Sequence, residues 1–160
     1  MESVALIGAS GSLGKSIASS LSAKATSYRV IGRSEQSLSE AFGSAPLAIW
    51  NPDEPESIRT ALTGVETAIY MVGVNYWQFE LHPQLMRKTI DGAIAAGVRR
   101  LLLIGTVYPY GKPQSERVSE DHPRQPHTLY VQRPYAQGAG RSCPCSTRYR
   151  KDADRYPEAA

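Results

Sequence analysis

The sequence has few of the residues that build metal sites and disulfide frameworks. Its 160 residues include two cysteines and three histidines. The cysteines, Cys143 and Cys145, stand together as CPC, and two such residues alone build neither a metal site nor a disulfide framework. His82, His122 and His127 have no metal-ligand spacing with one another or with acidic residues. We therefore expect no metal centre.

The chain also lacks a long apolar run. None approaches the about 20 residues that a membrane-spanning helix requires. The first short run, VALIG at residues 4–8, has no basic leader before it and no cleavage site after it. We expect no signal peptide, no membrane association and a cytoplasmic location. A length of 160 residues is enough for one domain with a core and too short for a typical two-domain enzyme, and a hydrophobic content of 41% is typical of a globular protein.

Charge of one sign is in excess only near the end of the chain. Residues 1–127 contain 12 basic and 12 acidic side chains, whereas residues 128–160 contain 6 and 3. A basic folded face would indicate nucleic acid, but a tail of unusual composition does not, so we expect no nucleic-acid partner. After Val131 the chain has no Ile, Leu, Val, Met, Phe or Trp, and it cannot bury enough apolar surface to offset its ordering entropy. We predict a folded domain at residues 1–127 and a disordered tail at residues 128–160.

What the first 105 residues do contain is an alternation of short apolar runs with helical patterns. We expect strands at residues 3–8, 28–32, 47–50, 67–73 and 99–106, separated by helices at residues 12–23, 34–42, 52–64 and 82–97. Ser34 is a candidate helix cap, Pro83 a helix entry, and Gly64 and Gly97 are helix stops. Strands this apolar are typically covered on both faces, as in a parallel sheet. The prediction is an α/β fold, a doubly wound parallel sheet of order 3-2-1-4-5, followed by a long surface loop at residues 106–127.

A glycine-rich loop follows the first expected strand. It reads IGASGSLGKS and places glycines three residues apart at Gly8, Gly11 and Gly14. The first glycine suits a tight turn, the second lets backbone approach a pyrophosphate, and the third lets the helix pack close to the strand. The N-terminus of the following helix offers free N–H groups to the diphosphate. The predicted cofactor-binding residues are Gly8, Ala9, Ser10, Gly11, Ser12, Leu13 and Gly14.

Two other interpretations of this loop stay open. Residues 9–16 resemble a triphosphate-binding loop with Ala9 in place of its first glycine. That chemistry also requires an acidic residue at the end of a neighbouring strand to hold magnesium, and AIYMVG and LLLIGT end without one. The loop can also be a glycine-rich turn that binds no ligand.

The residue after the second expected strand bears on which dinucleotide is bound. Proteins that prefer NAD usually carry Asp or Glu there, for the ribose 2′-hydroxyl. This chain has Arg33, which can hold a 2′-phosphate through charge-assisted bonds of about 1.5–3 kcal/mol each. Surface arginines after strands are also common without such a role. The sequence predicts NADP, with NAD less favoured.

Taken together, LIGASGSLG, RVIGRS, TALTGVETAIYMVG and RLLLIGTVYPYG resemble the extended or atypical short-chain dehydrogenase/reductases, and among them the NAD-dependent epimerase/dehydratase group. The resemblance covers residues 3 to about 127. It implies an NAD(P)-binding Rossmann fold that is truncated and incomplete on its C-terminal side. It also implies hydride transfer with NADP(H) on a small-molecule substrate that the sequence does not identify.

The resemblance also assigns site residues. It places Gly8 to Gly14 at the diphosphate and Arg33 at the adenosine ribose. Asn51, where members usually have Asp, falls at the adenine. Met71, Val72 and Gly73 would line the ribose side of the cleft, and the Thr106 hydroxyl would polarise a substrate carbonyl or alcohol.

The acid–base couple of the family, a tyrosine one helical turn before a lysine, is not found. Tyr108 and Lys112 have the spacing, but Pro109 forces Tyr108 out of helical geometry and Gly111 weakens any helix that follows. The proper pair belongs about twenty residues later in the resemblance, where the chain offers Tyr130 with Pro134 at the position of the lysine. The sequence therefore leaves catalysis undecided.

A frameshift is one hypothesis for the tail at residues 128–160. Codons that encode it can, read one base later, give a charged amphipathic helix followed by an apolar strand, which the family places there; the gene's nucleotide sequence tests this. Three interpretations of the chain follow: the NADP(H)-binding part of an oxidoreductase, epimerase or dehydratase; a non-catalytic NADP(H)-binding sensor or interaction module; or a gene remnant that does not fold stably. The sequence indicates no oligomeric state.

Overall fold

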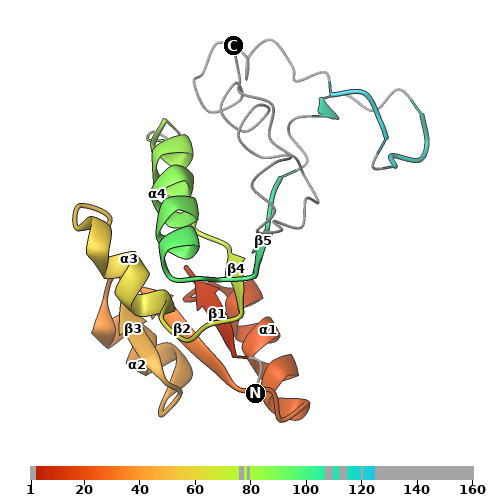
Figure 1. Cartoon of the computed structure of the whole chain (residues 1–160). Helices are drawn as coiled ribbons and strands as arrows, with labels where there is room; N and C mark the ends of the chain where they lie inside the picture. The colour runs from red at the N-terminus through yellow and green to blue at the C-terminus, as the bar shows by residue number, and fades with distance from the viewer. Residues whose placement is uncertain are drawn as a thin grey trace.

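The structure of the chain is a computed structural model, and it describes residues 3–75, 78, 80–106, 110–111, 115–119 and 121–124. Strands and helices alternate along these residues (Figure 1). The strands are β1 (Val4–Ile7), β2 (Tyr28–Gly32), β3 (Leu47–Ile49), β4 (Thr67–Tyr70) and β5 (Arg100–Leu103). The helices are α1 (Ser12–Ala23), α2 (Glu35–Phe42), α3 (Pro55–Leu62) and α4 (Leu81–Ala95).

The five strands form one parallel sheet in the order β3-β2-β1-β4-β5. This confirms the predicted doubly wound α/β fold and its strand order. In register, Val4 of β1 lies opposite Tyr28 of β2 and Thr67 of β4. The carboxyl ends of β1, β2 and β4 therefore lie at the same edge of the sheet, on either side of the point where the strand order reverses. Ligands of open α/β sheets bind at such a point.

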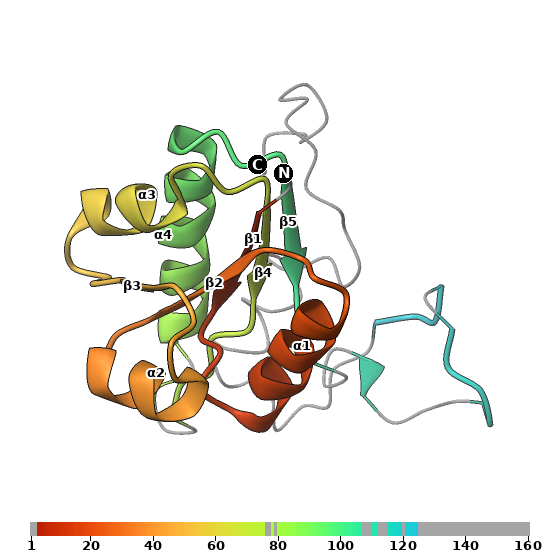
Figure 2. The same cartoon turned by 90° about the horizontal axis from the view of Figure 1, so that it is seen from below.

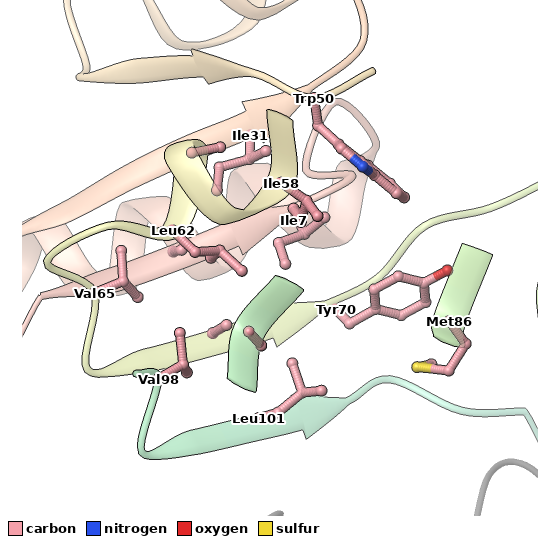
Figure 3. Packing of buried hydrophobic residues seen from close by; sticks show 14 residues of the cluster. Ile7, Ile31, Trp50, Ile58, Leu62, Val65, Tyr70, Met86, Val98 and Leu101 are labelled. Atoms are coloured by element: carbon pink, nitrogen blue, oxygen red, sulfur yellow. The ribbon is translucent and has the colours of Figure 1, made fainter. Parts of the chain in front are cut away.

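Two apolar layers cover the two faces of the sheet at β1 and β2. Figure 2 shows α3 and α4 on one side and α1 and α2 on the other. The α3/α4 layer packs on alternate strand residues that include Ile7, Ile31 and Leu101 (Figure 3). The α1/α2 layer packs on the residues between them, among them Leu6 and Val30. Strand residues that point to opposite faces are thus both buried in β1 and β2, as the uninterrupted apolar runs predict.

Local signals explain most helix boundaries. The Ser34 hydroxyl caps α2 by accepting from the Ser37 N–H (3.3 Å), and Pro55 is the first residue of α3. Gly64 and Gly97 follow α3 and α4 with φ values of +75° and +76°, which glycine adopts without strain. These residues act as the sequence predicts.

Two expectations were wrong in detail. Helix α4 begins at Leu81, so Pro83 lies within its first turn and is not its entry residue. Proline is tolerated there because the first N–H groups of a helix have no intrahelical acceptor. Strand β5 is not covered on both faces: Leu102 is 41% exposed, whereas its neighbour Leu101 is 6% exposed. Within the described residues, α4 covers the Leu101 face and no helix covers the Leu102 face.

Candidate functional site

The glycine loop that follows β1 has two glycines that the fold itself requires. Gly8 has a φ of +78°, and a Cβ there would lie 2.8 Å from the Val72 Cα. A Cβ on Gly14 would overlap the carbonyl oxygen of Ala9 and lie 2.5 Å from its Cα. These two glycines make the tight turn and bring α1 against the end of β1, the two functions that the sequence pattern assigns to them.

Gly11 is different, because no residue that the structure describes requires it to lack a side chain. A Cβ at Gly11 would meet no atom within 4 Å, and its φ of −80° and ψ of 176° suit any residue. The middle glycine therefore opens a space that the described chain does not fill. Such a space is what a diphosphate would occupy if it approached the backbone closely.

The N-terminus of α1 lies next to this space. Gly11 is the N-cap residue, no side chain caps the helix, and its first turn holds no acidic residue. The N–H groups of Ser12, Leu13 and Gly14 therefore keep the positive end of the helix available to an anion. Leu13 is 48% exposed and contributes only its backbone to this end.

A cleft of about 200 Å³ opens at the carboxyl edge of the sheet beside the loop. Six of the predicted residues line it: Gly8, Ala9, Ser10, Arg33, Val72 and Gly73. Five more that the sequence analysis did not assign complete the lining: Gly32, Ser34, Ser37, Leu38 and Trp50. The remaining predicted residues lie outside it: Gly11, Ser12, Leu13, Gly14, Asn51, Met71 and Thr106.

Arg33 carries the positive charge of this cleft. It follows the last residue of β2 and precedes the N-cap of α2, and its side chain is exposed. Within the described residues its guanidinium forms no hydrogen bond or ion pair. Its five donors are therefore available to an anion at the mouth of the cleft.

Asn51, the residue expected at the adenine, forms its hydrogen bonds within the turn that precedes α3. Its Oδ1 accepts from the Asp53 N–H (3.1 Å), and its Nδ2 donates to Glu54 Oε1 (2.8 Å). Its backbone N–H donates to Ser57 Oγ (2.7 Å), which itself donates to the Asn51 carbonyl (3.0 Å). Asn51 thus closes the turn that begins α3, and the adenine contact stays a prediction.

Trp50 is the largest of the five lining residues that were not among the predicted site residues. Its backbone N–H donates to the Gly32 carbonyl (2.8 Å), which extends the β2–β3 pairing and places the indole at the carboxyl edge. Trp50 is 2% exposed, and Figure 3 shows its side chain near that of Tyr70, the last residue of β4. The signal was present in the sequence, because Trp50 stands directly before Asn51 and directly after the apolar residues of β3.

Thr106 lies past the end of β5 and is partly buried. The backbone N–H of Ile104 donates to the Tyr70 carbonyl (2.9 Å), so β4 and β5 remain paired to within two residues of Thr106. Thr106 does not line the cleft, and its proposed role in catalysis stays a prediction. Tyr108, Pro109, Lys112, Tyr130 and Pro134 lie outside the described residues, as does the tail.

Comparison with known proteins assigns the family. The sequence profile described as NAD(P)H-binding matches residues 8–137, most of the chain. The chain belongs to the NAD(P)H-binding family. This decides between the two phosphate-loop interpretations in favour of the dinucleotide, in agreement with strands β4 and β5, which end without an acidic residue. No curated protein sequence matches significantly.

Solved structures of short-chain dehydrogenase/reductase and epimerase type share the fold of this NAD(P)H-binding chain. A short-chain dehydrogenase/reductase superfamily protein from Agrobacterium tumefaciens with bound NAD is 22% identical, with a TM-score of 0.68 over 86% of this chain and 42% of that one. Triphenylmethane reductase from Citrobacter sp., complexed with NADP(H), is 21% identical, with a TM-score of 0.63 over 86% and 42%. UDP-N-acetylglucosamine 4-epimerase from Bacillus cereus is 14% identical, with a TM-score of 0.69 over 87% and 50%. The chain spans half or less of the length of these proteins.

Two further features of the described residues concern other kinds of site. None of the helices there is long and apolar enough to cross a membrane. In the same part of the chain, no three His, Cys, Asp or Glu side chains gather as metal ligands would.

Proposed function

We propose that this NAD(P)H-binding chain prefers NADP(H) and serves as the cofactor-binding part of an oxidoreductase, epimerase or dehydratase. One observation carries the preference: Arg33 lines the cleft, while no acidic side chain among the described residues does. A carboxylate at that position would hold a ribose 2′-hydroxyl and repel a 2′-phosphate, and a guanidinium does the reverse.

The hydroxyls beside Arg33 support the same proposal. Ser34 and Ser37 both line the cleft at the start of α2. The positive end of α2 therefore faces the same region as the guanidinium. Glu35, in the first turn of α2, weakens this field, but it is exposed and is not part of the lining.

In the proposed binding mode, the diphosphate lies on the N-terminus of α1 over Gly11, and the adenosine lies in the cleft. The nicotinamide supplies hydride chemistry when the cofactor is bound. Thr106, past β5, is the side chain proposed to hydrogen-bond the reacting oxygen of a small-molecule substrate.

The test of the preference is a titration of the purified chain with NADPH and with NADH, followed by nicotinamide fluorescence. We expect R33A to weaken NADPH binding by about tenfold to a hundredfold and to leave NADH binding nearly unchanged. R87A is the matched control, because Arg87 is an exposed arginine on α4 outside the cleft and its loss removes the same charge. If R33A and R87A affect NADPH equally, the preference does not come from Arg33.

A second function, a non-catalytic NADP(H)-binding module, is favoured by a specific feature of the sequence. The only tyrosine four residues before a lysine is Tyr108, and Pro109 follows it directly. Consumption of NADPH in the presence of carbonyl substrates would support the enzyme and overturn the module. T106A would then reduce turnover while leaving the affinity for NADPH unchanged.

A further inference from the structure

Strand β5 carries apolar side chains that no helix of the described residues covers. Leu102 and Ile104 are 41% and 42% exposed. Leu101 and Leu103 point to the α3/α4 layer, so Leu102 and Ile104 point to the opposite face of the sheet. In register, Leu102 lies beside Ile69 of β4, which packs against the α1/α2 layer. The two exposed side chains therefore continue an apolar strip from β4 onto β5.

The backbone of β5 also has an outer side that is unpaired within the described residues. β5 is the last strand in the order of the sheet. The N–H of Ile104 donates to the Tyr70 carbonyl on the β4 side (2.9 Å). Because backbone groups alternate along a strand, the N–H and C=O groups of Leu103 and Leu101 point to the outer side. An edge with free backbone groups and exposed apolar side chains is a template for another strand.

The charges on β5 favour an antiparallel partner. Arg99 and Arg100 stand at the start of the strand, and no charged residue follows them before Lys112. A second copy of the strand paired in parallel would bring the arginines of both copies together. An antiparallel copy places them at opposite ends of the paired strands, where they do not repel each other.

The outward backbone groups fix the register of such a pair. With Leu103 on the two-fold axis, it exchanges two backbone hydrogen bonds with Leu103 of the second copy. Leu102 then lies directly opposite Ile104 of the second copy, with about 4.5 Å between their Cα atoms. Both Leu102–Ile104 pairs lie on the uncovered face and continue the apolar strip across the axis. The edge is thus self-complementary, as an isologous interface requires.

We propose that β5 pairs with β5 of a second copy in this antiparallel register and that the chain forms a dimer with one continuous sheet. Each copy uses its β5 edge, so assembly stops at two. The opposite edge suits pairing less, because β3 has only three residues, Leu47–Ile49, and short edge strands resist it. No residue of β5 lines the cleft, so this inference and the proposed cofactor binding can fail separately.

The first experiment is sedimentation equilibrium of the full chain over a range of concentrations. Reducing buffer prevents Cys143 and Cys145 from crosslinking copies. A single strand pair is smaller than a standard interface of about 1,600 Å², so we expect a monomer–dimer equilibrium with a dissociation constant in the micromolar range. A chain that stays monomeric up to about 0.5 mM would overturn the inference, as would species that grow beyond the dimer.

Two charge variants test the register. L102K and I104E each replace an exposed side chain, so both should show a melting transition close to that of the unaltered chain. Each should weaken its own dimer by about tenfold or more, because two charges then lie against apolar partners. Mixed in equal amounts, the two variants should form a heterodimer within about threefold of the unaltered affinity. In the mixture, one pair joins the introduced lysine to the introduced glutamate, and the other pair stays leucine with isoleucine.

I49K is the matched control, because Ile49 is a 40% exposed isoleucine on β3 at the other edge of the sheet. It should leave the dimer unchanged, and a loss equal to that in L102K would overturn the inference. A mixture of L102K with L102E should stay dissociated, because position 102 faces position 104 and not itself. Restored dimer in that mixture would overturn the register, as would folded L102K and I104E that do not associate with each other.

Discussion

Strands β1 and β2 have apolar side chains buried on both faces of the sheet, whereas β5 has a buried face that carries Leu101 and an exposed face that carries Leu102. The cleft that we propose for the adenosine lies at the carboxyl edge of the first region, between β1, β2, β3 and β4. Thr106, the proposed catalytic residue, follows the second region. The proposed cofactor site therefore lies in the part of the domain where the sheet is buried on both faces, whereas the proposed catalytic residue follows a strand whose Leu102 face no helix of the described residues covers.

The largest effect on the free energy of unfolding is expected from G14A, which changes the packing of α1 on the loop after β1. The added methyl would overlap backbone atoms of Ala9, and backbone cannot move aside as a flexible side chain can. We expect a loss of about 3 kcal/mol or more in the free energy of unfolding, measured by urea denaturation. Alanine is a better helix former than glycine by about 1 kcal/mol, so the sign of the effect separates packing from helix propensity. A stabilised G14A would contradict the packing of α1 on the loop.

The two faces of β5 can be compared directly through neighbouring leucines. L101A removes a side chain buried against the α3/α4 layer and should cost about 2–4 kcal/mol in unfolding free energy. L102A removes a partly exposed one and should cost less than about 1 kcal/mol. Denaturation of both variants under the same conditions measures the difference. Equal losses would mean that the Leu102 face is covered in solution.

Gly11 offers the sharpest separation of binding from stability. G11A places a methyl where no atom of the described chain lies within 4 Å, so the melting temperature should stay nearly unchanged. The same methyl would occupy the space proposed for the diphosphate. We expect NADPH binding to weaken by about tenfold or more, equivalent to about 1.4 kcal/mol, by nicotinamide fluorescence. If G11A bound NADPH with full affinity, the diphosphate would not lie over this loop. G14A is the contrasting variant, because it should lower the free energy of unfolding in the same assays.

The sequence alone predicts the region of β1 and β2 better than it predicts the region of β5. The strand order and the roles of Gly8, Gly14 and Ser34 depend on local patterns, periodicity and backbone geometry. Each of these can be recognised within a single segment of the sequence. The exposed face of β5 was not predictable, because an apolar strand reads the same whether one or two layers cover it. Trp50 was missed for a related reason: an aromatic residue at a strand end indicates burial, and only the assembled edge shows that it borders a cleft.

The smallest expected effect concerns pH and lies in the first turn of α4, on the β4–β5 side of the comparison. Burial lowers the pKa of His82 below its usual value of 6.5, since the imidazolium loses solvation in the folded chain. The unfolded chain therefore takes up this proton at a higher pH than the folded chain does. Stability from this group is fully present above about pH 6.5 and is lost as the pH falls through the lower, folded-state pKa.

The measurement is the fall in melting temperature between neutral and mildly acidic buffer, for the unaltered chain and for H82Q. Glutamine keeps a polar side chain but cannot take up the proton, so the fall should be smaller in the variant. H122Q is the control, because His122 lies in the segment at residues 121–124, away from α4 in the sequence. If H82Q shows the same fall as the unaltered chain, carboxylates elsewhere set the acid sensitivity. A smaller fall in H82Q alone would show that the start of α4 stays packed in solution even though the neighbouring strand β5 is covered on one face.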